Sequence, residues 1–219
     1  MQKLFIVILT ILTPLFMVAQ DSDLGSWYLY LGNKKLNDQW NLHHEIQYRN
    51  YDGIGDLEQL LLRTGVGYNL TENNNILLLG YGYILSENYL EDLNVKQSVV
   101  EHRIYQQYQL KQSLGIVNFK HRFRFEQRFV EADFKSRLRY FLSVSIPVNN
   151  KLLENNTLYV SAYNEIFLNT SASMYDRNRL YGGIGYKINE TIKLELGYMN
   201  QFFESASRDQ INTIMYLNF

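Results

Sequence analysis

Residues 119–129 read FKHRFRFEQRF, a ribbon in which apolar aromatic and charged residues alternate. Successive side chains of a β-strand point to opposite faces, so the stretch predicts a strand with one phenylalanine face and one charged face. Basic residues mixed with aromatics also occur where proteins bind nucleic acid. The charge of the whole chain argues against nucleic acid, because phosphate affinity needs an excess of Lys and Arg and the formal net charge is −1.

The same alternation recurs on both sides of this stretch, and no helical period is sustained after Gln20. We identify eleven strand-like segments, at 25–32, 40–51, 58–70, 76–86, 98–110, 116–129, 136–146, 157–168, 178–188, 192–203 and 210–219. Most of them match or exceed the roughly 9 to 11 residues that a tilted strand needs to cross a bilayer. Strands of soluble proteins are about half as long.

Two kinds of all-β protein show such alternation. A soluble barrel or sandwich turns its apolar face inward, whereas a membrane barrel turns it toward lipid. Strand length, 18 tyrosines, only two prolines and no cysteine favour the membrane barrel. The last segment, QINTIMYLNF, alternates to a terminal Phe219, like the signal by which outer-membrane barrels engage their assembly machinery. We therefore expect a closed antiparallel up-and-down transmembrane β-barrel.

The N-terminus carries a predicted export signal. Lys3 precedes an apolar run that ends in Val-Ala before a polar stretch, so residues 1–19 read as a signal peptide and residues 20–219 as an outer-membrane barrel. With no cysteine, the exported chain cannot be stapled by disulfides and depends on a large closed sheet for stability.

Strand number and orientation follow from the connections. An odd number of strands would leave the two chain ends on opposite sides, so we expect ten or twelve, with 25–32 the weakest segment. Short turns belong on the periplasmic side and long loops outside. The short connections are 71–75, 111–115 and 189–191, with 147–156 assigned to the same side despite its length. The longer, often acidic ones are 87–97, 169–177 and 204–209.

The face opposite the apolar residues is strongly charged, and we expect it to line the lumen. Its predicted basic residues are Arg49, Arg63, Arg103, Lys120, Arg122, Arg124, Arg128, Arg137, Arg139, Arg179, Lys187 and Lys193. Its predicted acids are Glu45, Glu101, Glu126, Glu165 and Glu195. Twelve cations minus five acids leave an excess of seven positive charges. Turn centres near 113 and 133 place Glu101 opposite Arg124 and Glu126 opposite Arg139.

That lumen supports two interpretations. Arg and Glu side chains of neighbouring strands can pair into a network that fills a narrow barrel, since charges away from water need partners. Alternatively, the uncompensated arginines can form an anion-biased channel for small solutes. Both suit a monomeric barrel of ten to twelve strands without a cofactor or a metal.

Three further roles concern the outer surface. A lipid hydrolase or acyltransferase would use lipid-facing histidines, and His44, His102 and His121 have that parity, but no serine stands beside them as a nucleophile. A partner protein could contact the polar lipid-facing positions, which are His44, His102, Gln106 and Asn164. Acidic external loops could hold cations that bridge to lipopolysaccharide, although no loop has the spacing of a calcium motif.

Glycines recur in two similar segments, GVGYNLTENNNILLLGYG (65–82) and GIGYKINETIKLELGYMN (183–200). Their G-x-G pairs are followed by a turn and another strand, whereas a phosphate-binding loop would open a helix. We expect these glycines to leave space for Arg and Tyr side chains inside a narrow barrel.

Several stretches together resemble a known family. They are Trp27 shortly after VAQ, EHRIYQQYQL (101–110), FKHRFRFEQRF, LYVSAYNEIFLN (158–169) and DRNRLYGGIGYKINETIKLELGYMNQ (176–201). Their order is similar to domain-of-unknown-function family 2490, small outer-membrane β-barrels of Bacteroidota-type Gram-negative bacteria. The resemblance implies a fold and a location, and it carries no catalytic residue. The most family-like stretches contain Glu126, Arg128, Glu165, Asn178 and Arg179.

Overall fold

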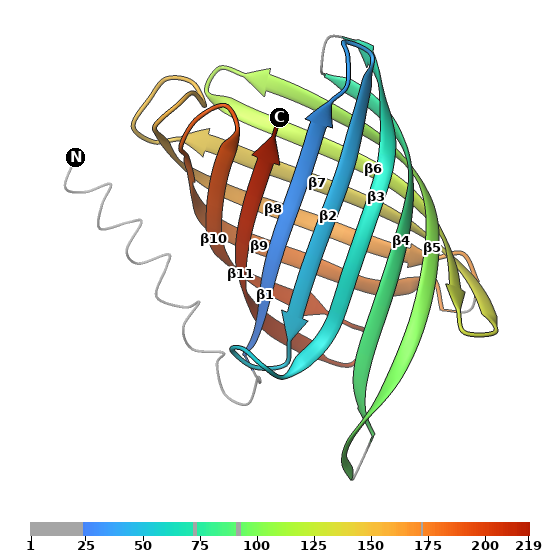
Figure 1. The fold of residues 1–219 in the computed structure, drawn as a ribbon. Coiled ribbons are helices and arrows are strands. Elements are labelled where there is room, and N and C mark those ends of the chain that lie inside the picture. Colours follow the sequence, from blue (N-terminus) through green and yellow to red (C-terminus); the bar gives the residue numbers. More distant parts are fainter. Residues whose placement is uncertain (1–23, 72–73, 91–92, 172) are drawn as a thin grey trace.

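Every regular element in the described part of this computed structural model is a β-strand (Figure 1). The structure describes residues 24–71, 74–90, 93–171 and 173–219, so the predicted signal peptide, 1–19, lies outside the described residues. The strands are β1 (Gly25–Lys35), β2 (Trp40–Asn50), β3 (Leu57–Thr71), β4 (Asn75–Leu90), β5 (Leu93–Leu114), β6 (Val117–Val130), β7 (Asp133–Pro147), β8 (Thr157–Asn169), β9 (Tyr175–Lys187), β10 (Ile192–Phe202) and β11 (Ser207–Asn218). All eleven predicted segments are confirmed. No helix among the described residues is long and apolar enough to cross a membrane.

The strands close into one barrel, in which each strand pairs with its neighbours in sequence and β1 pairs with β11. The predicted closed barrel of about ten to twelve strands is confirmed. The expectation of an even number with antiparallel pairing throughout is wrong, because the described residues form eleven strands and the closing pair is parallel. Figure 1 shows β1 and β11 side by side with their arrows in the same direction. Strands joined by hairpins alternate in direction, so the first and the last of an odd number run the same way.

The closing pair is regular over its whole length. Its register runs from Gly25 opposite Gln210 to Asn33 opposite Asn218. At its end the Lys35 N–H donates to the Phe219 carbonyl at 2.7 Å, and the Phe219 N–H donates to the Asn33 carbonyl at 3.0 Å. Phe219 therefore holds β1 and β11 together through its backbone hydrogen bonds. We call the β1–β11 pair the seam.

The expected difference between short and long connections is largely absent. The predicted acidic loop 87–97 is wrong, because β4 and β5 continue through it to Leu90 and from Leu93. The predicted strands ended too early there, because Asn, Asp and Glu are depleted in strands and suggested a loop. The connections at the two ends of the barrel are of comparable length, so their lengths do not orient the barrel.

The two faces of the wall differ as the alternation predicts. On β6 and β7 the Phe123 and Leu138 side chains are exposed on the outside, whereas Arg124 and Arg139 are buried inside. The same reversal holds around the wall, where the large exposed residues are mainly apolar and the buried residues are largely polar or charged. The arrangement is the reverse of a sheet whose apolar face is packed inward.

One side of the interior is apolar and aromatic. Trp27, Tyr181, Met199 and Ile214 are buried against one another on β1, β9, β10 and β11. The lumen therefore combines an apolar wall beside the seam with buried charged residues on β2, β3 and β5 to β10.

Glycines make room for tyrosine rings within this narrow lumen, as expected from the sequence. Tyr105 lies over Gly80, Tyr159 over Gly185, and Tyr181 over Gly197, each so closely that a Cβ at the glycine would overlap the ring. A tyrosine that covers the glycine of a neighbouring strand restores the packing that glycine alone lacks.

Gly185→Ala is expected to destabilise the barrel by about 1–3 kcal/mol, the usual cost of overpacking. The added methyl would displace Tyr159, which is fully buried and donates its hydroxyl to Glu195 Oε2 at 2.8 Å. Gly182→Ala is the matched control on the same strand, because its Cβ would meet nothing within 4 Å. Equilibrium urea unfolding of both variants checks the expectation, and equal effects would show that Tyr159 can move freely.

Candidate functional site

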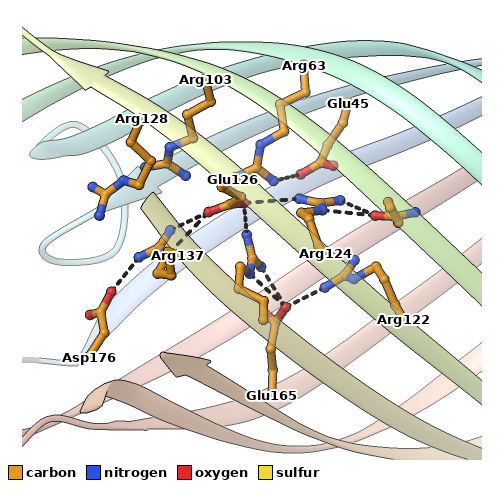
Figure 2. Close-up of polar contacts among 12 residues, drawn as sticks. Glu45, Arg63, Arg103, Arg122, Arg124, Glu126, Arg128, Arg137, Glu165 and Asp176 are labelled. Carbon is orange, nitrogen blue, oxygen red and sulfur yellow. Dashed lines mark hydrogen bonds and ion pairs between the residues drawn. The ribbon is translucent and has the colours of Figure 1, made fainter. Parts of the chain in front are cut away.

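The middle of the lumen is organised around one carboxylate, Glu126 on β6, which is completely buried. Arg137 Nη2 lies 2.7 Å from its Oε2, and Arg139 Nη1 lies 2.5 Å from its Oε1. Arg124 Nη1 is 3.6 Å from the same Oε1. Figure 2 shows Glu126 with dashed lines to Arg124 and Arg137. We call the layer of the lumen that Glu126, Arg124, Arg137 and Arg139 form the waist.

Glu165 on β8 extends the waist network. Its Oε1 accepts hydrogen bonds from Arg122 Nη2 and from Arg139 Nη2, both at 2.6 Å. Its Oε2 is 3.8 Å from Arg179 Nη1. Arg139 thus bridges two buried carboxylates, so the ion pairs of β6, β7, β8 and β9 form one connected group.

The other three predicted acids hold separate partners. Glu45 Oε1 is 2.7 Å from Arg63 Nη1. Glu101 contacts Arg128 Nε at 2.6 Å and Arg103 Nε at 2.5 Å. Glu195 accepts two neutral hydrogen bonds at 2.8 Å, from the hydroxyls of Tyr159 and Ser161. The carboxylates are therefore satisfied by charge or by hydroxyl groups, as burial requires.

Four guanidinium groups lie around the ring of one phenylalanine, Phe167. Arg139 lies 4.3 Å from the Phe167 ring centroid, Arg179 4.6 Å, Arg137 5.0 Å and Arg177 5.9 Å. Phe167 is almost fully buried at the upper side of the waist. A ring face attracts cations, so Phe167 offsets part of the repulsion between arginines that outnumber the acids.

Burial shows that the waist is closed to water in this structure. Glu126 is 0% exposed and Arg124 3%, and the neutral residues Tyr105, Leu61 and Ile84 are 0% exposed at the same level. A pore wide enough for water would leave the groups that line it accessible to water. The arrangement therefore fills the lumen rather than lining a passage through it.

The predicted lumen residues all point inward, but two predicted pairs are affected by an error in register. Glu101 lies opposite Val130, and Arg124 lies opposite Arg139 and contacts Gln107, so the predicted pair Glu101–Arg124 is wrong. Glu126 is opposite Arg137, although it also reaches Arg139 diagonally. The hairpin turns lie at 115–116 and 131–132, about two residues from the expected centres.

Several lumen residues, among them Asp176, Arg177 and Lys111, were missed because the predicted strands were too short. Asp176 was assigned to a loop, but it lies on β9 and accepts a hydrogen bond from Arg137 at 2.6 Å. Lys111 was assigned to a turn, but β5 continues to Leu114 and keeps the inward parity of Gln107. The signal was present in the sequence, since the alternation extends through Lys111 until Gly115.

The outward polar residues satisfy one another on the wall. The His102 ring lies 2.6 Å from the Tyr81 hydroxyl, and the His121 ring lies 2.9 Å from that of Tyr140. The remaining contacts are Gln106 with Gln127 at 3.3 Å, Asn164 with Asn178 at 2.7 Å, and the His44 ring beside Tyr30 and Phe219.

His102 and His121, two of the three lipid-facing histidines considered for an enzyme, are far apart along the wall. His121 lies opposite Leu110, eight positions along β5 from His102 (110 minus 102), or about 26 Å at 3.3 Å per residue. The two histidines therefore stand at separate places on the wall, and each contacts a tyrosine.

Comparisons with known proteins give a family without an activity. The family model described as "Protein of unknown function (DUF2490)" matches residues 24–212. An uncharacterised protein of Methylorubrum extorquens is 32% identical over 184 residues, which cover 80% of this chain and 77% of that protein. No solved structure matches the chain.

Proposed function

Since this chain belongs to the family of proteins of unknown function DUF2490, which carries no assigned activity, we propose from its geometry that it is an integral outer-membrane β-barrel closed to ion flow. The proposal has two parts. The first concerns the membrane, and the second concerns the lumen.

The membrane location is supported by the outer wall. Its exposed apolar residues occur on every strand except β1, and every strand has at least 11 residues, enough to cross a bilayer. Aromatic pairs stand toward both ends, with Trp40 and Tyr68 at one end and Phe129 and Phe134 at the other. Such aromatics are enriched at the two edges of a membrane. The predicted signal peptide and Phe219 favour export and assembly in the outer membrane.

The closed lumen is supported by one observation, the complete burial of Glu126 among Arg124, Arg137 and Arg139. Ions cross a channel through sites that bind them weakly enough to release them. At the waist these positions are occupied by the protein's own guanidinium and carboxylate groups, which are bound to each other. The barrel then serves as a structural or accessory component and not as an open anion channel.

Planar-bilayer conductance of the refolded chain from residue 20 tests the second part. We expect no discrete current steps in a potassium chloride gradient. Steps with chloride preference, reduced in Arg122→Ala and Arg124→Ala, would overturn the closed lumen and establish the anion channel.

Heat-modifiable gel migration and protease protection in liposomes test the first part on the same preparation. We expect both, because a folded barrel in a bilayer resists detergent and shields its strands. A protein that stays soluble without lipid and shows no heat-modifiable band would overturn the membrane assignment. These checks also establish that a silent bilayer contains folded, inserted protein.

A further inference from the structure

A pocket of ≈ 450 Å³ occupies the lumen between the waist and the end of the barrel that holds Phe219. Its lining runs from exposed residues of the rim, such as Lys111 and Gln112, to buried residues of the waist, such as Glu165 and Arg179. Because the waist is filled, the pocket is open at one end only. A solute can therefore bind in this pocket but cannot continue through the waist to the other end of the barrel.

Three lysines on this pocket have no acidic partner. Among the residues that the structure describes, the side chains of Lys111, Lys120 and Lys193 form no ion pair or hydrogen bond. Lys193 Nζ instead lies 3.9 Å from the Tyr216 ring centroid. The acids that share the lining are already engaged, Glu165 by Arg122 and Arg139, and Glu195 by two hydroxyls.

The lysines come from separate strands and converge on one space. They stand on β5, β6 and β10, so they surround the pocket from more than one side. An ammonium group is a compact point charge with three donors, which suits the several oxygens of a phosphate group. Ser143 and Ser145 line the same space and add hydroxyl groups that can donate to those oxygens.

The seam side of the pocket has a different chemistry. Leu29 and Leu31 of β1 and Ile214 of β11 line it, together with the rings of Phe141 and Tyr216. These residues belong to or pack on the buried apolar cluster beside the seam, apart from Phe141 on β7. A ligand that fills the pocket therefore meets both cations and apolar surface, and Lys193 lies beside the Tyr216 ring of the seam side.

We propose that this pocket binds a small organic phosphate, a phosphate monoester whose charged group contacts the three lysines and whose apolar group lies against the seam wall. Three uncompensated cations match a dianionic group better than a single negative charge. The volume accommodates a ligand of ten to twenty heavy atoms, about the lower range of small-molecule sites. The inference goes beyond the closed barrel proposed above and does not depend on whether the barrel conducts.

Isothermal titration of the refolded chain in lipid nanodiscs with phenyl phosphate tests the proposal. Inorganic phosphate supplies the charge alone, and benzyl alcohol supplies the ring alone. We expect one site for phenyl phosphate, at least about tenfold weaker binding of inorganic phosphate, and none of benzyl alcohol at the same concentrations. Lys120→Gln should weaken phenyl phosphate about tenfold or more, as expected for a lost charged hydrogen bond.

Lys135→Gln is the matched control, because it removes one positive charge at the opposite end, where Lys135 Nζ is 3.8 Å from Asp133. Equal weakening in both lysine variants would show a diffuse charge effect and overturn the site. Equal binding of phenyl phosphate and inorganic phosphate would overturn the role of the apolar wall. No heat from phenyl phosphate with folded protein would overturn the proposal altogether.

A second measurement avoids any dependence on the folding of Lys120→Gln. Acylation of the unaltered protein with an amine-reactive ester, followed by mass spectrometry, reports the reactivity of each lysine. Phenyl phosphate should protect Lys111, Lys120 and Lys193 and leave Lys135 unchanged. Unprotected pocket lysines under saturating ligand would contradict the site. A conducting bilayer would overturn the closed lumen and leave these binding results intact.

Discussion

Glu126→Gln is expected to lower the free energy of unfolding by about 3–5 kcal/mol, the usual cost of breaking a buried ion pair by removing one charge. The substitution keeps the size of the side chain, so packing is preserved. It leaves Arg137 and Arg139, which now lie 2.7 and 2.5 Å from Glu126, without its negative charge. Both guanidinium groups are buried and cannot recover their hydration.

Glu190→Gln provides the matched control for the loss of a carboxylate. Glu190 Oε2 is 3.0 Å from Lys187 Nζ, but its side chain is 76% exposed, so we expect a loss of at most about 1 kcal/mol. Urea unfolding in the same detergent, followed by tryptophan fluorescence, compares the two variants. If both lose equally little stability, water reaches the waist and the lumen is not closed.

Phe167→Ala is expected to cost about 3–5 kcal/mol, because it deletes a buried ring and leaves a cavity at the waist. It also removes the surface on which Arg139 and Arg179 lie, at 4.3 and 4.6 Å from the ring centroid. Phe167→Leu separates these effects, since leucine keeps most of the volume and has no π-system. We expect a loss of about 1–2 kcal/mol from the missing cation–π contacts in this desolvated position.

Phe134→Ala is the corresponding control on the outer wall. Phe134 is exposed and its ring is tilted against that of Phe129, at 5.3 Å between centroids, so its loss is expected to cost about 0.5–1.5 kcal/mol. The same unfolding measurement applies. A Phe167→Leu variant as stable as the parent would show that the guanidinium groups gain nothing from the ring.

The fold was largely predictable because alternation is a local property of the sequence. Every second residue of FKHRFRFEQRF points inward, and a strand of period two leaves no other assignment for Arg124 or Glu126. Strand ends were less predictable, because β4 and β5 extend through polar residues that also favour loops. The number of alternating segments, eleven, equals the number of strands among the described residues. We nevertheless expected ten or twelve, because an even number would place both chain ends on the same side.

The contacts of the site were less predictable than its composition. A shift of two residues in a hairpin preserves the face of every side chain and changes every partner, so Glu101 was assigned to the lumen but paired with the wrong arginine. The pocket depends on Lys111, which the sequence placed in a turn. Its apolar wall depends on the closing pair, and no local pattern indicates the parallel register in which β1 and β11 pair.

The seam also sets the order in which the barrel can form. Every other pairing joins strands that follow one another in sequence, whereas the seam joins Gly25 to Gln210, which are 185 positions apart (210 minus 25). Contacts between such distant residues form slowly, because chain entropy is lost before they are made. Until then β1 and β11 each present an open edge that can pair with another chain. Pairing of β1 with β11 is thus the late step of folding. Until it occurs, the open edges of β1 and β11 must be protected from pairing with other chains.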